Sequence, residues 1–192
     1  MTVSVPAERS SQKKKNGFVE GFFDWTEAVI TALIAVMVLF VFVARVNVVV
    51  DGSSMEPNYY NHYRVFVNCV DRSFSRGDVV VIDANGTQMK ERLIKRVIAT
   101  EGQTVDIDSA SGTVLVNGKA LDESAYIRNG ITAQTGSVKF PVTVPKGCVF
   151  VLGDNRTVSQ DSRFPEVGMV STHYLIGKVE FLLNPFRGFH AS

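Results

Sequence analysis

The sequence lacks several features that would indicate common functional classes. Its formal net charge is only +1, which provides no general attraction to nucleic acid. Internal repeats and low-complexity linkers are also missing. The only two cysteines, Cys69 and Cys148, do not have the spacing of a metal-binding motif. They can be buried thiols or a disulfide on an oxidising side of a membrane, and sequence alone does not decide between these.

Polar residues are almost missing from one stretch near the N-terminus. Between Ala28 and Ala44, Thr31 is the only polar residue. As a helix this stretch would be about 25 Å long, near the lower limit for crossing a bilayer. Trp25 before it and Arg45 after it suit the two membrane interfaces. We therefore predict one transmembrane anchor helix at residues 25–45, in contact with membrane lipid.

The basic residues near this stretch predict its orientation. Arg9 and Lys13 to Lys15 precede the apolar run, whereas Arg45 alone follows it closely, so the N-terminus is expected in the cytoplasm. A cleavable signal peptide is an alternative, although Phe42 makes a poor cleavage site; a buried soluble helix would normally show a polar stripe. The predicted organisation is a cytoplasmic tail (1–24), the anchor (25–45) and an extracytoplasmic domain (46–192) at the cell membrane.

Short apolar segments predict that the domain after residue 46 is mainly β. Alternation of apolar and polar residues predicts a half-buried strand at Val138–Val144, limited by Pro141. Asn85-Gly86 and Asn117-Gly118 are typical of hairpin turns. No long helical period occurs outside the apolar run. The remaining expected core strands are Val46–Val50, Val65–Val67, Val79–Ile82 and Val149–Leu152. This pattern predicts an antiparallel β domain with many turns.

Ser54 is the first candidate for chemistry. It lies in the segment Asp51-Gly52-Ser53-Ser54-Met55-Glu56-Pro57. A serine in such a turn can expose its hydroxyl for attack and its backbone N–H for binding an oxyanion. The plain alternative is a surface turn, since serine, glycine and proline are common in turns.

Lys95 is the second candidate, because it is flanked by Ile94 and, beyond Arg96, by Val97. Burial without a carboxylate lowers the pKa of a lysine, and a neutral lysine can remove a serine proton. The alternative is an exposed lysine whose stem covers a sheet edge. Neighbouring Arg96 is expected to form an ion pair.

The third candidate is the polar loop from Gly153 to Arg163. Four charged side chains of this loop can pair locally and stiffen it, and Ser159 can donate a hydrogen bond to a neutral lysine. The alternative is a solvated loop whose ion pairs contribute little stability. The four charged residues are Asp154, Arg156, Asp161 and Arg163.

Taken in order, these motifs resemble the bacterial type I signal peptidases, also called Ser-Lys leader peptidases. Gly52-x-Ser54-Met55-x-Pro57 is similar to the family's nucleophile motif, and Lys95-Arg96 to its general-base motif. The loop from Gly153 to Gly168 is similar to a third signature, and Ile176–Val179 to the closing strand. The resemblance extends from about Val46 to Phe186.

The resemblance implies a coiled antiparallel β-sheet catalytic domain. It implies a serine endopeptidase that removes N-terminal signal peptides from secretory preproteins after small residues, of the Ala-x-Ala type. Ser54 would be the nucleophile, Lys95 the general base and Ser159 the residue that orients the lysine. The loop charges would be structural. No metal and no organic cofactor are expected, and the three histidines are expected to be bystanders: His62, His173 and His190.

One departure from the family concerns the oxyanion. Some members have a serine where this chain has Gly52, so the Ser54 N–H, with Ser53 nearby, would carry that task. A preprotein would add a strand beside the segments that precede the two catalytic residues. The expected walls of that site are Val48, Val49, Val50, Asp51, Arg92, Leu93 and Ile94.

Three other functions compete with general signal-peptide removal. A non-catalytic relative could assist pilus or surface-protein assembly, but it would lose the Ser-Lys dyad. A specialised protease could process a single conjugative or pilin substrate with the same chemistry. A self-cleaving Ser-Lys repressor is disfavoured by the apolar run and by the lack of a DNA-binding segment. The sequence makes no prediction of oligomeric state.

Overall fold

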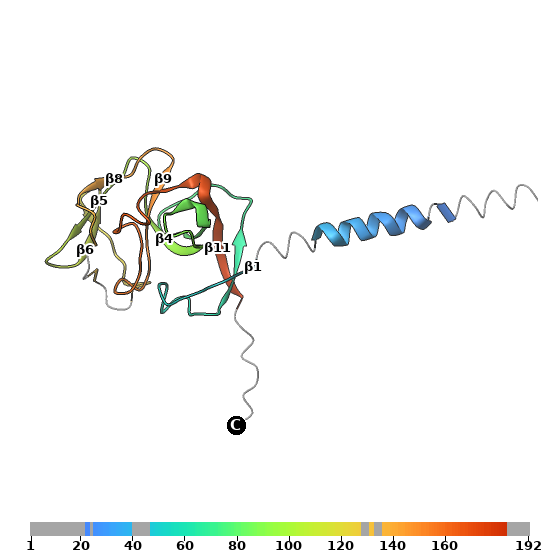
Figure 1. Ribbon diagram of the computed structural model, residues 1–192, viewed down its shortest axis with the longest axis horizontal. Coiled ribbons are helices and arrows are strands. Elements are labelled where there is room, and N and C mark those ends of the chain that lie inside the picture. Colours follow the sequence, from blue (N-terminus) through green and yellow to red (C-terminus); the bar gives the residue numbers. More distant parts are fainter. Residues whose placement is uncertain (1–21, 24, 40–46, 128–130, 133–135, 184–192) are drawn as a thin grey trace, which may run out of the picture. The chain divides into compact units, whose positions relative to one another are not determined.

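The protein divides into two compact units, Met1–Arg45 and Val46–Ser192. The computed structural model describes residues 22–23, 25–39, 47–127, 131–132 and 136–183 (Figure 1). The predicted tail up to residue 21 and the end of the predicted anchor, residues 40–45, lie outside the described residues.

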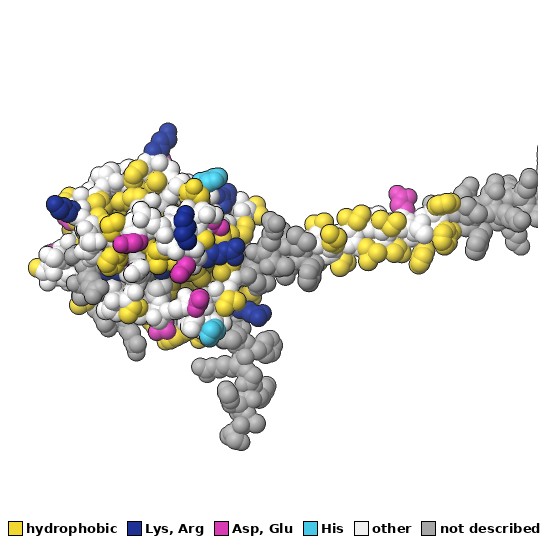
Figure 2. Space-filling view, viewed as in Figure 1, with side chains coloured by type: hydrophobic (Ala, Val, Ile, Leu, Met, Phe, Trp, Pro, Cys, Tyr) yellow, Lys and Arg dark blue, Asp and Glu magenta, His cyan; other side chains and the backbone are white. Residues whose placement is uncertain are grey.

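The first unit contains an α-helix over the described residues 22–23 and 25–39. Hydrophobic side chains extend along it (Figure 2), and the large ones are exposed: Phe22, Phe23, Trp25, Val29, Ile30, Leu33, Ile34, Val36, Met37, Val38 and Leu39. Considering the described part of the chain alone, none of its helices combines the length and apolar character needed to cross a bilayer.

The second unit is mainly β, as predicted, and its larger sheet carries the candidate site. All neighbouring strands pair antiparallel, in the order β1-β2-β11-β3-β4-β9-β10. Bulges in β4 and β11 increase the local twist, and the sheet curls in Figure 1. The strands are β1 (Asn47–Val49), β2 (Arg64–Asn68), β3 (Val79–Ile82), β4 (Leu93–Thr100), β9 (Cys148–Leu152), β10 (Val170–Ser171) and β11 (Leu175–Leu183).

A smaller antiparallel sheet has the order β7-β6-β5-β8. Its strands are β5 (Thr104–Asp108), β6 (Thr113–Val116), β7 (Lys119–Ala120) and β8 (Val142–Thr143). Ile98 of β4 and Phe150 of β9 share one buried cluster with Val105 and Val114 of this sheet. The two sheets therefore share a hydrophobic core, which holds the smaller sheet against the strand that carries Lys95.

The two predicted hairpin signals had different outcomes. Asn117 and Gly118 join β6 to β7 with φ angles of 52° and 74°, which suit a tight primed turn. Asn85-Gly86 does lie in the connection between the antiparallel partners β3 and β4, but the prediction that it forms a tight hairpin turn was wrong. Residues Ala84–Gly86 form a 3₁₀ turn (η1), because the Asp83 side chain accepts a hydrogen bond from the Asn85 N–H and caps it.

The predicted strand at Val138–Val144 was also wrong over most of its length, since only β8 is strand there. Pro141 has no N–H to donate to a ladder. The N–H groups of Ser137 and Val138 instead donate to the Arg163 carbonyl, each at 3.0 Å. The start of this segment is therefore attached to the charged loop, and only its β8 residues join a sheet.

The two cysteines are free thiols. Cys69 is exposed and Cys148 is half-buried, so the structure has neither the disulfide nor the buried thiol pair that the sequence left open. Within the described part of residues 47–183, the only helical elements are two short 3₁₀ turns, η1 and η2 (Thr172–Tyr174).

Candidate active site

Ser54 and Lys95, which are 41 positions apart in the chain, meet at the larger sheet. Ser54 lies in the turn that follows β1, and Lys95 is the third residue of β4, paired with Val80 of β3. Lys95 Nζ donates a hydrogen bond to Ser54 Oγ at 2.8 Å. A potential nucleophile and a potential base are thus within proton-transfer distance.

The environment of Lys95 favours its neutral form. Lys95 is only 2 % exposed, and it lies between Ile94 and Val97 in a mostly buried stretch of β4. Burial lowers the pKa of Lys95 to about 8; the charge of Asp161, then that of Asp154, opposes this shift, and Arg163 adds to it. No ion pair holds the Lys95 ammonium among the described residues, so desolvation dominates.

The nucleophile turn is held from both sides. On the side of the core, Met55 is buried in a cluster with Val65 and Ile94. From the charged loop, the Asn155 N–H donates to the Ser54 carbonyl at 3.0 Å, and Asn155 Nδ2 donates to the Ser53 carbonyl at 3.2 Å. Within the described residues, the N–H groups of Ser53 and Ser54 donate no hydrogen bond, which leaves them able to bind an oxyanion.

Ser159 lies beside the dyad but does not make the predicted hydrogen bond to Lys95. It is 3 % exposed, and its hydroxyl has no partner in the described part of the chain. Ser159 packs closely against Gly153: a Cβ at Gly153 would lie 2.1 Å from Ser159 Oγ and 2.6 Å from the Ser54 carbonyl oxygen. Glycine at 153 therefore permits the loop to approach the nucleophile turn.

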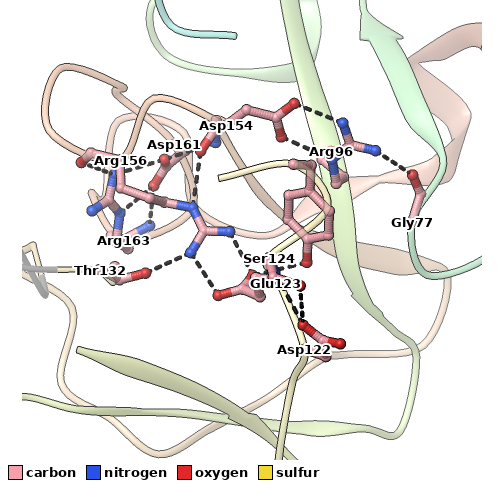
Figure 3. Close-up of polar contacts among 12 residues, drawn as sticks. Gly77, Arg96, Asp122, Glu123, Ser124, Thr132, Asp154, Arg156, Asp161 and Arg163 are labelled. Carbon is pink, nitrogen blue, oxygen red and sulfur yellow. Dashed lines mark hydrogen bonds and ion pairs between the residues drawn. The ribbon is translucent and has the colours of Figure 1, made fainter. Parts of the chain in front are cut away.

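Three arginines each bind a carboxylate around the site (Figure 3): Arg156 and Arg163 are buried, and Arg96 is half-buried. The prediction that the four loop charges pair with one another holds only for Asp161 and Arg163, at 2.8 Å. Asp154 instead binds Arg96 of β4 through two hydrogen bonds of 2.8 and 2.6 Å, as expected for an ion-pairing Arg96. The loop is thus tied to the strand that carries Lys95.

Arg156 pairs with Glu123, a residue that the sequence analysis did not single out. Arg156 Nη2 lies 2.6 Å from Glu123 Oε1, and both side chains are buried. Tyr126 also donates to Glu123, at 2.9 Å. No sequence signal near Glu123 indicated this, because its partner is 33 positions away in the chain. The segment that carries Glu123 therefore supports the loop.

Asn58 joins the nucleophile turn to the same network. Its Nδ2 donates to Asp154 Oδ2 at 2.8 Å and to the Tyr126 carbonyl at 2.7 Å. The guanidinium of Arg96 also lies 4.4 Å from the centre of the Tyr126 ring. One carboxylate, Asp154, thereby connects the turn, the charged loop and β4.

A cleft of about 500 Å³ opens beside the dyad. Ser54 and Lys95 line it, together with Val48, Val49, Asp51, Val81, Glu91, Arg92, Leu93 and Ile94. Six of the seven predicted wall residues are therefore present. Val50 was the wrong one: it is 2 % exposed and packs with Met55 in the core, because its side chain points to the opposite face from that of Val49.

Groups that could hold a metal are not found in the described ranges, where no three His, Cys, Asp or Glu side chains are suitably clustered. His62 and His173 are exposed and line neither the cleft nor the dyad, and His190 lies outside the described residues. The chemistry that the site can perform with its own side chains is attack by an activated serine.

Comparison with known proteins gives consistent results. The family model described as "Signal peptidase, peptidase S26" matches residues 22–184. A signal peptidase I of Bacillus licheniformis is 34% identical over 94% of this chain and 96% of its own length. Signal peptidase I T of Bacillus subtilis (strain 168) is 33% identical over 94% of this chain and 92% of its own length. A crystal structure of a signal peptidase I from Enterococcus faecalis V583 has a TM-score of 0.45 at 31% identity, covering 56% of this chain and 97% of that one.

Proposed function

Because this chain belongs to the signal peptidase family, peptidase S26, and is a peptidase, we propose that it cleaves signal peptides from secretory preproteins with a Ser54–Lys95 dyad. The observation that carries the proposal is the 2.8 Å contact between Lys95 Nζ and Ser54 Oγ in a buried niche. A buried amine without a carboxylate partner can be neutral near pH 8 and act as a base.

In the first half of the reaction, neutral Lys95 takes the Ser54 proton while Ser54 Oγ attacks the scissile carbonyl carbon. The carbonyl oxygen becomes an oxyanion, which the Ser54 N–H can bind, with Ser53 beside it. The C–N bond then breaks, and Lys95 gives its proton to the leaving amine, the new N-terminus of the mature protein. An acyl-enzyme on Ser54 remains.

In the second half, Lys95 takes a proton from water, and the resulting hydroxide attacks the acyl carbon. The ester bond to Ser54 breaks, the Ser54 oxygen recovers a proton from Lys95, and the signal peptide leaves as a carboxylic acid. Lys95 is positioned by its own strand and by its contact with Ser54.

The preprotein is proposed to bind in the cleft as an extended strand. β1 is an edge strand, since β2 is its only partner in the sheet order, and it can accept a further strand. The side chains of Val48, Leu93 and Ile94 give the cleft apolar walls next to Ser54. Such walls suit small apolar side chains before the cut, as in Ala-x-Ala.

Residues 25–45 are proposed to anchor the protein in the cell membrane, with the tail in the cytoplasm and the peptidase unit outside. Support comes from the exposed apolar helix of the first unit and from the basic residues that precede it. This location would bring the dyad to the membrane face at which signal peptides arrive.

The test is cleavage of several preproteins by the full-length protein in detergent, with Ser54→Ala and Lys95→Ala as variants. We expect wild type to release the mature proteins and both variants to lose at least about 10³-fold in rate. Equal processing by all three proteins would remove the dyad assignment. Processing of a single preprotein among many would favour the specialised role over the general one.

A further inference from the structure

We propose that a second cavity, on the other flank of the nucleophile turn, binds the first side chains of the mature protein after the cut. We further propose that, because of Glu56, this cavity prefers a cationic side chain of the substrate to an anionic one. This inference rests on the proposed signal-peptide cleavage and adds a specificity determinant to it.

The second cavity has a volume of about 220 Å³, roughly the volume of seven waters and enough for one long side chain. Ile127 and Ile131 form its apolar wall, and the polar residues that line it come from the nucleophile turn and the charged loop. Its lining residues are Glu56, Ile127, Ile131, Asp154, Asn155, Arg156 and Thr157. None of them lines the 500 Å³ cleft, so the two spaces are distinct.

Ser54 connects the two spaces. Its side chain lines the cleft, and its carbonyl accepts a hydrogen bond from Asn155, which lines the second cavity. Glu56, two residues after Ser54, belongs to the second cavity alone. A peptide with residues before the cut in the cleft and its scissile bond at Ser54 must continue past this turn. The second cavity adjoins this turn through Glu56 and can receive that continuation.

The charges of the lining leave one anion without a partner. Asp154 is neutralised by Arg96 at 2.6 Å, and Arg156 by Glu123 at 2.6 Å. The Glu56 carboxylate, by contrast, has neither a hydrogen bond nor an ion pair in the described part of the chain. A lysine or arginine of the substrate could pair with Glu56 while its aliphatic stem covers Ile127 and Ile131.

The experiment compares preproteins that differ only in the first two residues after the cut, with lysine, alanine or glutamate there. Cleavage by the full-length protein is measured as kcat/KM. For wild type we expect lysine to exceed glutamate by about tenfold, the effect of a partly exposed ion pair and of like-charge repulsion. Glu56→Gln should reduce this ratio to near one, and Glu56→Lys should invert it.

Glu166→Gln is the matched control, since it removes the same charge from an exposed residue that lines neither space. We expect it to keep the wild-type ratio. Equal cleavage of the three substrates by wild type, or an unchanged ratio in Glu56→Gln, would overturn the inference and leave the proposed function intact. Failure of wild type to cleave any preprotein would overturn the proposed function itself, and the inference with it.

Discussion

Two adjoining regions of the β-rich unit bury cations in opposite ways. In the arginine network, Arg96, Arg156 and Arg163 each lie within 2.8 Å of a carboxylate oxygen. In the dyad, Lys95 is as buried as Arg156 and Arg163, but among the described residues its amine has only the hydroxyl of Ser54 as a partner. The paired arginines stay charged and hold loops in place, whereas burial lowers the pKa of the unpaired lysine to about 8.

The contrast shows how one small region can hold both structural and reactive cations. The nearest carboxylates, Asp154 and Asp161, are already occupied by Arg96 and Arg163. They raise the pKa of Lys95 by charge, but less than burial lowers it. The network therefore serves two purposes: it stiffens the loop, and it keeps both carboxylates away from the amine.

The largest expected effect comes from making the dyad cation permanent. Lys95→Arg keeps a positive donor beside Ser54, but a guanidinium does not give up its proton near neutral pH. We expect preprotein cleavage to fall by at least about 10³-fold, measured as kcat/KM. Lys178→Arg is the matched control, because Lys178 already pairs with Asp71 outside the site and should retain activity. Substantial cleavage by Lys95→Arg would contradict the neutral-base role.

The next largest effect is expected in the arginine network, where removing a carboxylate leaves a buried arginine without its ion-pair partner. Glu123→Gln deprives Arg156 of its ion-pair partner, and we expect the free energy of unfolding to fall by about 3–5 kcal/mol. Urea denaturation of the full-length protein in detergent measures it. The exposed Glu180→Gln should change stability by no more than about 0.5 kcal/mol. A Glu123→Gln protein as stable as wild type would show that the pair does not hold the loop.

A smaller effect, of opposite sign, is expected when the buried amine is replaced by an apolar side chain. Lys95→Met is expected to abolish activity but to raise the free energy of unfolding at pH 7 by up to about 3 kcal/mol, since a depressed pKa is a cost of folding. Between about pH 8 and 10.5 the unfolded lysine binds more protons than the folded one, so wild type gains stability there. The difference should therefore vanish above about pH 10.5; a constant difference would exclude titration as its cause.

The mildest test changes pH alone. If cleavage needs neutral Lys95, kcat/KM should fall about tenfold for each pH unit below an apparent pKa near 8, and reach a plateau above it. The measurement is a pH–rate profile on one preprotein. An acidic limb centred near pH 10.5, the ordinary range of a lysine, would mean that the amine is hydrated during catalysis.

Some features of this molecule could be read from short segments. Runs of β-branched residues predicted β2, β3 and β9, since local apolar patterns decide which segments are strands. Asn117-Gly118 predicted its turn, because both residues tolerate positive φ angles. The apolar neighbours of Lys95 indicated its burial before any contact was known.

Other features depended on residues brought together from distant segments. The partners of Arg96 and Arg156 lie 58 and 33 positions away, so nothing nearby in the sequence indicated Asp154 or Glu123. Val138–Val144 had a strand pattern, but at its start the Val138 N–H donates to the Arg163 carbonyl, and only Val142–Thr143 join a sheet. The expected bond from Ser159 to Lys95 is also missing, and Ser159 is packed closely against Gly153 instead.

The sequence by itself determined a β-rich domain after an apolar helix, and the residue types needed for a serine nucleophile activated by a lysine base. The tertiary structure alone decided which buried cation would lack a carboxylate. Periodicity and turn chemistry act over a few neighbouring residues, whereas the desolvation and pairing that set a charge depend on every group that the fold packs around it.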